Sequence, residues 1–154
     1  MLNKILERIS GALTKDEVSD SGEREDAIEL ATAALMIEVA RADHHFDPRE
    51  FEKLIKLLEA RLNLTPDAAL LLSEQAETRV ENSVSLYEFT RRLHDSLEPS
   101  EKSSIVDMLW QVAFADGRLD MYEDALILKL SDLLYVPRTE VMRLKSIAKK
   151  SIAH

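Results

Sequence analysis

A twelve-residue pattern occurs twice in this chain, and it constrains the fold more than any other feature of the sequence. Residues 39–50 overlie residues 112–123 when the chain is shifted by 73 positions, and six of the twelve pairs are identical. The shared pattern is V-A-x-A-D-x-x-(F/L)-D-x-x-E, and an apolar stretch with helical spacing follows each copy. Because each copy of such a repeat forms one supersecondary unit, we predict two homologous helix–loop–helix hairpins related by a pseudo-two-fold axis.

Apolar residues recur at helical spacing along most of the chain, and no stretch has the alternation of a strand. The chain has only 3 Gly and 4 Pro, which is few for a turn-rich β fold. Helix-start signals, such as Thr65 before Pro66 and Ser85 three residues before Glu88, place helices from about residues 24, 48, 66, 85, 99, 120 and 137. We therefore predict an all-α fold, a compact bundle of about seven to eight antiparallel helices with an internal pseudo-two-fold repeat.

The N-terminal region differs from the rest of the chain. Residues 2–13 carry apolar side chains on one helical face, and residues 14–23 are rich in Ser, Asp and Glu. Such polar composition is typical of a linker or a disordered loop. We predict an N-terminal helix and flexible linker over residues 1–23, and one helical domain over residues 24–154.

Charge and composition limit the possible functions. The formal net charge is -9, which argues against nucleic-acid binding because phosphate contacts need a basic face. The chain has no Cys, so a disulfide framework, a thiolate zinc site and a cysteine nucleophile are excluded. No apolar run approaches the length of a membrane span, and the charged N-terminus does not read as a secretory signal. We expect a cytoplasmic protein.

The C-terminal residues carry the opposite charge to the rest. Five Lys and Arg side chains against Glu140 alone give residues 137–154 a net charge of +4. This helix either complements its own dipole and packs on the acidic body, or presents a basic face to an acidic partner or a membrane surface. The apolar residues Val141, Leu144 and Ile147 favour packing.

The second copy of the repeat carries a family resemblance. Residues 113–123, A-F-A-D-G-R-L-D-M-Y-E, resemble the A-x-A-D-G-x-(hydrophobic)-D-x-x-E motif of TerB-like (tellurite-resistance) proteins. Residues 86–93 also resemble stand-alone bacterial members, and the resemblance covers about residues 24–150. It implies an all-α domain linked to tellurite or stress resistance, often through acidic, metal-binding motifs, with relatives beside membrane-anchored J-domain co-chaperones. The first copy departs from the motif, because His44 stands where the second copy has Gly117.

The acidic motifs allow two interpretations. Asp47 and Asp120 each stand where an N-cap accepts backbone N–H groups, with Glu50 and Glu123 three residues later to reach back. Asp43 and Asp116 instead end helices, where the dipole disfavours a carboxylate, so a local turn or a bound cation should compensate. Oxygen ligands suit Ca²⁺, Mg²⁺ or Mn²⁺, and the neighbouring His side chains suit Zn²⁺. The candidate metal ligands are Asp43, Asp47, Glu50, Asp116, Asp120 and Glu123, with His44 and His45 peripheral.

The sequence therefore predicts a non-enzymatic, stress-associated module that binds a protein partner, with membrane-associated proteins among the candidates, and a divalent cation at its acidic loops. The alternative is a purely structural interaction domain whose acidic motifs are helix caps. A metal-dependent enzyme is a third option with little support, because no nucleophile or general base stands out and no catalytic residue is assigned. His94 is expected on a solvent face and Trp110 in the core. The sequence does not indicate an oligomeric state.

Overall fold

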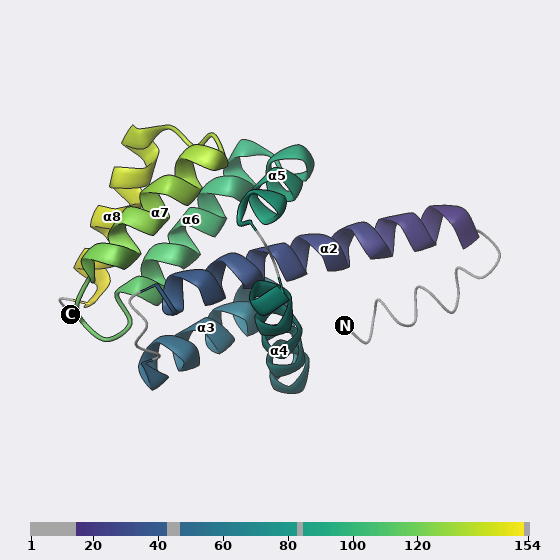
Figure 1. Ribbon diagram of the computed structural model, residues 1–154, viewed down its shortest axis with the longest axis horizontal. Coiled ribbons are helices and arrows are strands. Elements are labelled where there is room, and N and C mark those ends of the chain that lie inside the picture. Colours follow the sequence, from purple (N-terminus) through teal and green to yellow (C-terminus); the bar gives the residue numbers. More distant parts are fainter. Residues whose placement is uncertain (1–14, 43–46, 83–84, 153–154) are drawn as a thin grey trace.

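The computed structural model describes residues 15–42, 47–82 and 85–152, with side chains from residue 22 onward. Within these residues the chain forms helices and no strand, which confirms the all-α fold (Figure 1). The helices are α2 (Lys15–Ala40), α3 (Pro48–Arg61), α4 (Pro66–Asn82), α5 (Tyr87–Ser96), α6 (Pro99–Ala113), α7 (Met121–Leu133) and α8 (Arg138–Ile152). Helices α2 and α6 pack against each other in the centre, and every other helix packs on at least one of them.

The start of α2 differs from the sequence prediction. Residues 15–23 were expected to be a linker, but they form the first turns of α2, whose N-terminal half extends beyond the other helices in Figure 1. Composition misled here because a polar segment that continues a nucleated helix adds a hydrogen bond per residue and needs no apolar face of its own. The helix predicted over residues 2–13 and the rest of the linker, Thr14, lie outside the described residues.

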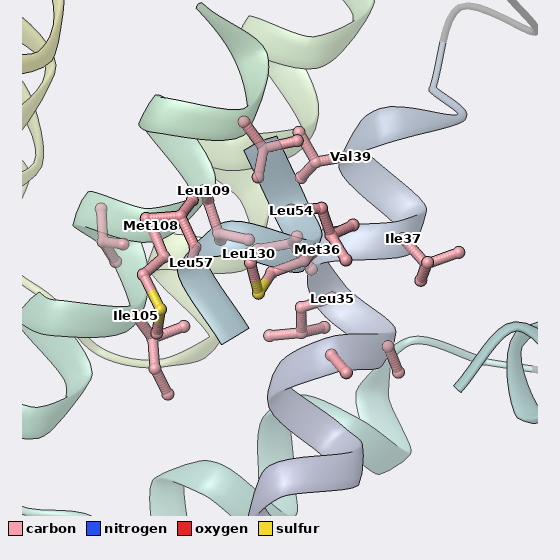
Figure 2. Close-up of a cluster of buried hydrophobic side chains, with 14 of the residues drawn as sticks. Leu35, Met36, Ile37, Val39, Leu54, Leu57, Ile105, Met108, Leu109 and Leu130 are labelled. Carbon is pink, nitrogen blue, oxygen red and sulfur yellow. The ribbon is translucent and has the colours of Figure 1, made fainter. Parts of the chain in front are cut away.

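The core lies between the two helical hairpins of the repeat. Leu35, Met36 and Ile37 of α2 are fully buried, and Leu109 of α6 is buried beside them (Figure 2). Leu54 on α3 and its equivalent Ile127 on α7 are also fully buried, as are Val39 and Val112 in the two motif copies. Burying each large aliphatic side chain stabilises the fold by about 1.5–3 kcal/mol. The residues shared by the two copies therefore build one common core.

The repeat extends beyond the two hairpins into a third helix. Both α3 and α7 end at a residue with left-handed backbone, Asn63 with φ 54° and Tyr135 with φ 59°. The next residues, Leu64 and Val136, are buried and donate their amide N–H to the carbonyl five residues earlier, each at 3.0 Å. Both helices thus end in the same Schellman motif. The offset here is 72 residues rather than 73, so the second copy is one residue shorter.

The helices that follow these ends match as well. On α4 the residues Ala69, Leu72 and Ala76 are buried, and 72 positions later Val141, Leu144 and Ala148 are buried on α8. Each of these helices packs on the first helix of its own unit, α4 on α2 and α8 on α6. The repeating unit is therefore three helices long, and α5 joins the two units. Residues 34–58 and 107–131 contain the same order of helix, loop and helix, and their superposition remains a prediction.

The C-terminal helix packs on the body, as its apolar residues indicated. The indole Nε1 of Trp110 donates to the carbonyl oxygen of Val141 at 3.1 Å, and Lys145 lies 5.3 Å from the centre of the Trp110 ring. Lys145 also donates to Asp124 on α7 at 2.8 Å. Ile147 was predicted inward but is 49% exposed, because the buried seam follows positions 141, 144 and 148. No helix in the described ranges is both long and apolar enough to cross a membrane.

The starts of α3 to α8 agree with the sequence signals to within a few residues, unlike the start of α2. Thr65 accepts the amide N–H of Ala68 at 3.2 Å, and Pro66 is the first residue of α4. The fourth predicted helix, α5, begins at Tyr87, two residues after Ser85, whose hydroxyl accepts the Tyr87 N–H at 3.1 Å. Local side-chain chemistry therefore fixes where these helices begin.

Candidate functional site: two acidic loops

Asp47 and Asp120 are the N-caps of α3 and α7, as the capping interpretation predicted. Asp47 has extended backbone (φ -74°, ψ 124°) and accepts the Arg49 N–H at 2.8 Å. Asp120 accepts the N–H groups of Tyr122 at 2.7 Å and Glu123 at 3.3 Å. Because one oxygen of each carboxylate bonds the first turn of a helix, these two residues have a structural role in both loops.

Glu50 and Glu123 occupy equivalent positions three residues after these caps, and both are buried. Their side chains are only 2% and 1% exposed. A carboxylate is withdrawn from water only where surrounding groups compensate for its lost hydration. These two residues therefore belong to the interior of the helix starts, and the solvent-facing surface of the loops is formed by other side chains.

Asp116 closes a local turn at the end of α6. Its Oδ1 accepts the Arg118 N–H at 2.9 Å, and Gly117 between them has φ 85°. Glycine adopts this left-handed backbone without the steric cost that a side chain brings. The predicted local turn therefore offsets the position of Asp116 at the helix end. Its counterpart Asp43 lies outside the described residues, as do His44 and His45.

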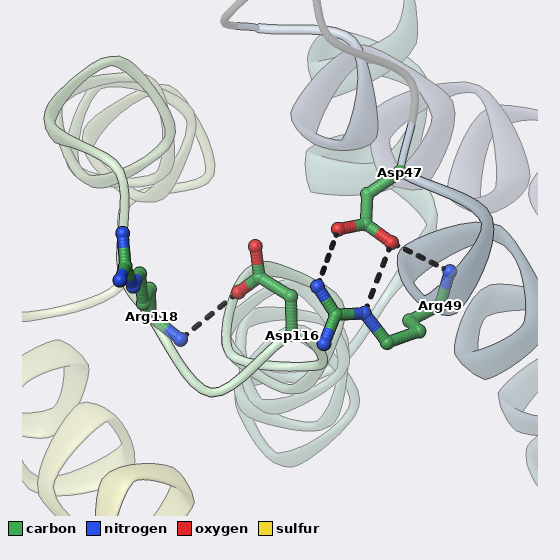
Figure 3. Close-up of polar contacts among 4 residues, drawn as sticks. All are labelled: Asp47, Arg49, Asp116 and Arg118. Carbon is green, nitrogen blue, oxygen red and sulfur yellow. Dashed lines mark hydrogen bonds and ion pairs between the residues drawn. The ribbon is translucent and has the colours of Figure 1, made fainter.

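Arg49 is a further charged residue at these loops, and sequence reasoning missed it. Its guanidinium donates to Asp47 through Nε at 3.3 Å and Nη2 at 3.1 Å. The hydrogen bonds from Arg49 hold the pKa of Asp47 below its usual range, and Asp47 first and Asp116 to a lesser extent raise the pKa of Arg49. Figure 3 shows the carboxylate of Asp116, from the other repeat, bonded to Arg118 and not to Arg49. Arg49 is thus bound to Asp47 of the first repeat and interacts only electrostatically with Asp116 of the second.

The described residues alone do not form the predicted metal site. Among them, no group of three or more His, Asp and Glu side chains is arranged to hold a metal ion. Asp47 binds the Arg49 guanidinium, Asp116 accepts the Arg118 N–H, Asp120 caps a helix, and Glu50 and Glu123 are buried. A cation at this position would have to displace Arg49 or recruit oxygen and nitrogen atoms from residues 43–45.

Two residues outside the loops were also singled out by the sequence. Trp110 is fully buried, in agreement with a packing role. His94 was expected on a solvent face, but it is half-buried: its Nδ1 contacts the ammonium of Lys102, and its ring lies 4.5 Å from that of Tyr135. Neither neighbour is close to His94 in sequence, so helical position alone gave the wrong environment.

One comparison with known proteins identifies a family for this chain. Residues 29–146 match the family model described as tellurite resistance protein TerB. This range includes both motif copies and most of both three-helix units. No curated protein and no solved structure matches the chain.

Proposed function

Because the chain belongs to the TerB family, we propose that it is a non-enzymatic cytoplasmic module that acts in tellurite or stress resistance by binding a protein partner. The observation that carries this proposal is the use of the acidic motifs. Asp47, Asp116 and Asp120 each accept a backbone N–H, and Arg49 pairs with Asp47. Carboxylates engaged in this way hold a surface in shape and are poor candidates for a general base.

The survival of cells exposed to tellurite tests this role. Cells that lack the gene should lose resistance, and wild-type protein should restore it. Cross-linking within the restored cells, followed by mass spectrometry, should yield the same partner peptide from independent preparations. Restored survival with no reproducible cross-linked partner would contradict a partner-binding role, and unchanged survival after deletion would contradict the role in resistance.

A cation at the acidic loops is the second candidate, and the position of Arg49 favours it. The guanidinium binds Asp47 and interacts electrostatically with Asp116, so carboxylates of both repeats favour a positive charge at its position. A divalent ion such as Ca²⁺, Mg²⁺, Mn²⁺ or Zn²⁺ would compete with Arg49 for Asp47 and Asp116, with Asp43, His44 and His45 as further ligands.

Thermal melting with and without each ion tests this candidate. An ion that binds only the folded state raises stability by about 2.7 kcal/mol at a hundred times its dissociation constant. Arg49→Gln should increase that response because it removes the competing cation, and Asp116→Asn should decrease it. If no ion changes the melting temperature of any of the three proteins, the alternative holds, in which the acidic motifs are only helix caps.

A further inference from the structure

The outer face of α8 concentrates positive charge on an acidic protein. Residues 138–152 contain five Lys and Arg against Glu140, a net +4, while the whole chain carries -9. Arg138, Arg143 and Lys145 form ion pairs with Asp132, Glu140 and Asp124. Lys149 and Lys150 are exposed, and neither has an ion pair with another residue in the described ranges. Positive charge at the C-terminal end of this face is thus available to a partner.

Apolar side chains lie among these charges. Met142, Ile147 and Ile152 are 44%, 49% and 42% exposed, although the inner seam of α8 buries Val141, Leu144 and Ala148. Single exposed apolar residues are common on protein surfaces. Met142 shares the outer face of α8 with the basic residues, while Ile147 and Ile152 flank the buried seam on either side. Met, Arg and aromatic side chains are the types enriched at protein interfaces.

Tyr135 lies just before α8 and is held in an unfavourable backbone conformation. Its φ of 59° is left-handed, where a bulky side chain is an outlier, and the equivalent residue of the first unit is Asn63. Its side chain is 74% exposed and its ring rests on that of His94, which in turn contacts Lys102. The Schellman end of α7 requires this backbone conformation, and the contact with His94 sets the position of the ring. The ring is therefore an exposed aromatic group whose position is fixed.

We propose that Tyr135 and the outer face of α8 form a docking surface for an acidic segment of a partner protein. The docking surface is defined by Tyr135, Arg138, Met142, Arg143, Lys149 and Lys150. The Tyr135 ring and Met142 contact apolar side chains of the segment, and the Lys and Arg groups contact its carboxylates. This inference rests on the proposed function and names the partner surface.

The charge distribution decides between possible occupants. An anionic bilayer would repel the rest of a chain that carries -9 overall. A second copy could offer the acidic N-terminal half of α2, but Glu23, Glu25 and Asp26 there already take part in contacts within the chain. A separate acidic segment meets neither obstacle.

Fluorescence anisotropy tests the docking surface. The probe is a fluorescein-labelled helical peptide that is rich in Glu and carries Leu and Phe on one face. The peptide should bind the full chain, and its affinity should fall strongly as the salt concentration is raised. A peptide in which Gln replaces every Glu should not bind. Tyr135→Asn should weaken binding about tenfold, as loss of an aromatic hot spot does, and should not lower the melting temperature because Asn tolerates this backbone.

Matched variants separate a docking surface from general effects. The double variant Lys149→Gln/Lys150→Gln should weaken peptide binding and reduce the salt dependence of that binding. The control double variant Lys56→Gln/Arg91→Gln changes the net charge of the protein by the same amount and should bind the peptide like the wild type. Tyr122→Asn, an exposed Tyr beside the acidic loops, should also bind normally. Equal loss in the control variants would overturn the proposal.

Other occupants give distinct outcomes. If the protein binds phosphatidylglycerol vesicles but not the peptide, the occupant is a membrane and the proposal is overturned. If sedimentation shows salt-sensitive self-association, the occupant is a second copy of the chain and the proposal is likewise overturned. Failure of the peptide to bind while the wild-type protein still restores tellurite survival and yields its cross-linked partner would reject this surface and leave the proposed function standing.

Discussion

At the scale of single residues, the two N-caps make a prediction that separates capping from charge. Asp120 accepts two backbone N–H groups at the start of α7. Asp120→Ala removes both acceptors and should lower the free energy of unfolding by about 0.5–2 kcal/mol, while Asp120→Asn should change it little because Asn caps nearly as well. Urea denaturation measures both. Equal destabilisation by Ala and Asn would mean that the charge, and not the cap, stabilises the loop.

A second residue-scale prediction concerns Glu38, which is half-buried on α2. Burial raises its pKa above the usual 4.5, and Arg41 lowers it by a smaller amount. The folded state therefore disfavours the carboxylate, with a penalty that is absent below pH 4.5 and develops as pH rises through the folded-state pKa. Glu38→Gln should be more stable than wild type at pH 7, and the difference should disappear in acid.

The second repeat supplies the control for this substitution. Gln111 occupies the equivalent position, 73 residues later, and donates to Asp107 at 2.9 Å. Gln111→Glu should destabilise the protein at pH 7, because it adds a carboxylate beside Asp107. Denaturation midpoints of the wild type and both variants, measured across the pH range, test these two expectations. A Glu38→Gln variant less stable than wild type at pH 7 would contradict the burial argument.

Sequence reasoning succeeded where the chemistry is local. The caps Asp47 and Asp120 and the left-handed Gly117 follow from residue types within a few positions of one another. It missed Arg49, although its main partner, Asp47, is only two residues away; the weaker electrostatic contribution of Asp116 comes from the opposite repeat and depends on the fold. A search for basic residues within reach of the Asp47 cap would have found it.

At the scale of elements, α2 is longer than its composition indicated. Gly22 lies within the turns that were expected to be a linker. Gly22→Ala should increase helicity, because Ala is favoured over Gly in a helix interior by about 0.5–1 kcal/mol. Circular dichroism measures the gain, and hydrogen exchange should show slower exchange confined to residues near 22. Unchanged helicity and exchange would mean that this segment is not helical in solution.

The third helices of the two units were not recognised as equivalent from the sequence. Few identities link α4 and α8, since Ala69 aligns with Val141 and Ser73 with Lys145, and a one-residue deletion shifts the register. What the two helices share is the spacing of buried positions, which similar-sized apolar residues fill without identity. Physical equivalence at this scale therefore persists where sequence identity does not.

At the scale of the whole molecule, the two units depend on each other through α2 and α6. Each of these helices packs on its own unit and on the other, so neither unit has a separate core. Removing one outer helix should therefore destabilise the entire chain. α8 is the suitable helix to remove, because it is terminal and covers Trp110, the only Trp in the sequence.

Truncation after Pro137 tests this dependence. The loss of buried Val141 and Leu144 alone costs several kcal/mol, at about 1.5–3 kcal/mol per side chain, which is comparable to the whole stability of a typical domain. It also removes the carbonyl that accepts the Trp110 N–H. The truncated chain should show a red-shifted Trp110 emission and a much lower or absent urea transition. Arg143→Gln with Lys150→Gln, which removes charge from α8 but keeps its packing, should retain the wild-type emission. A truncated chain with wild-type emission and midpoint would show that α8 is not part of the common core.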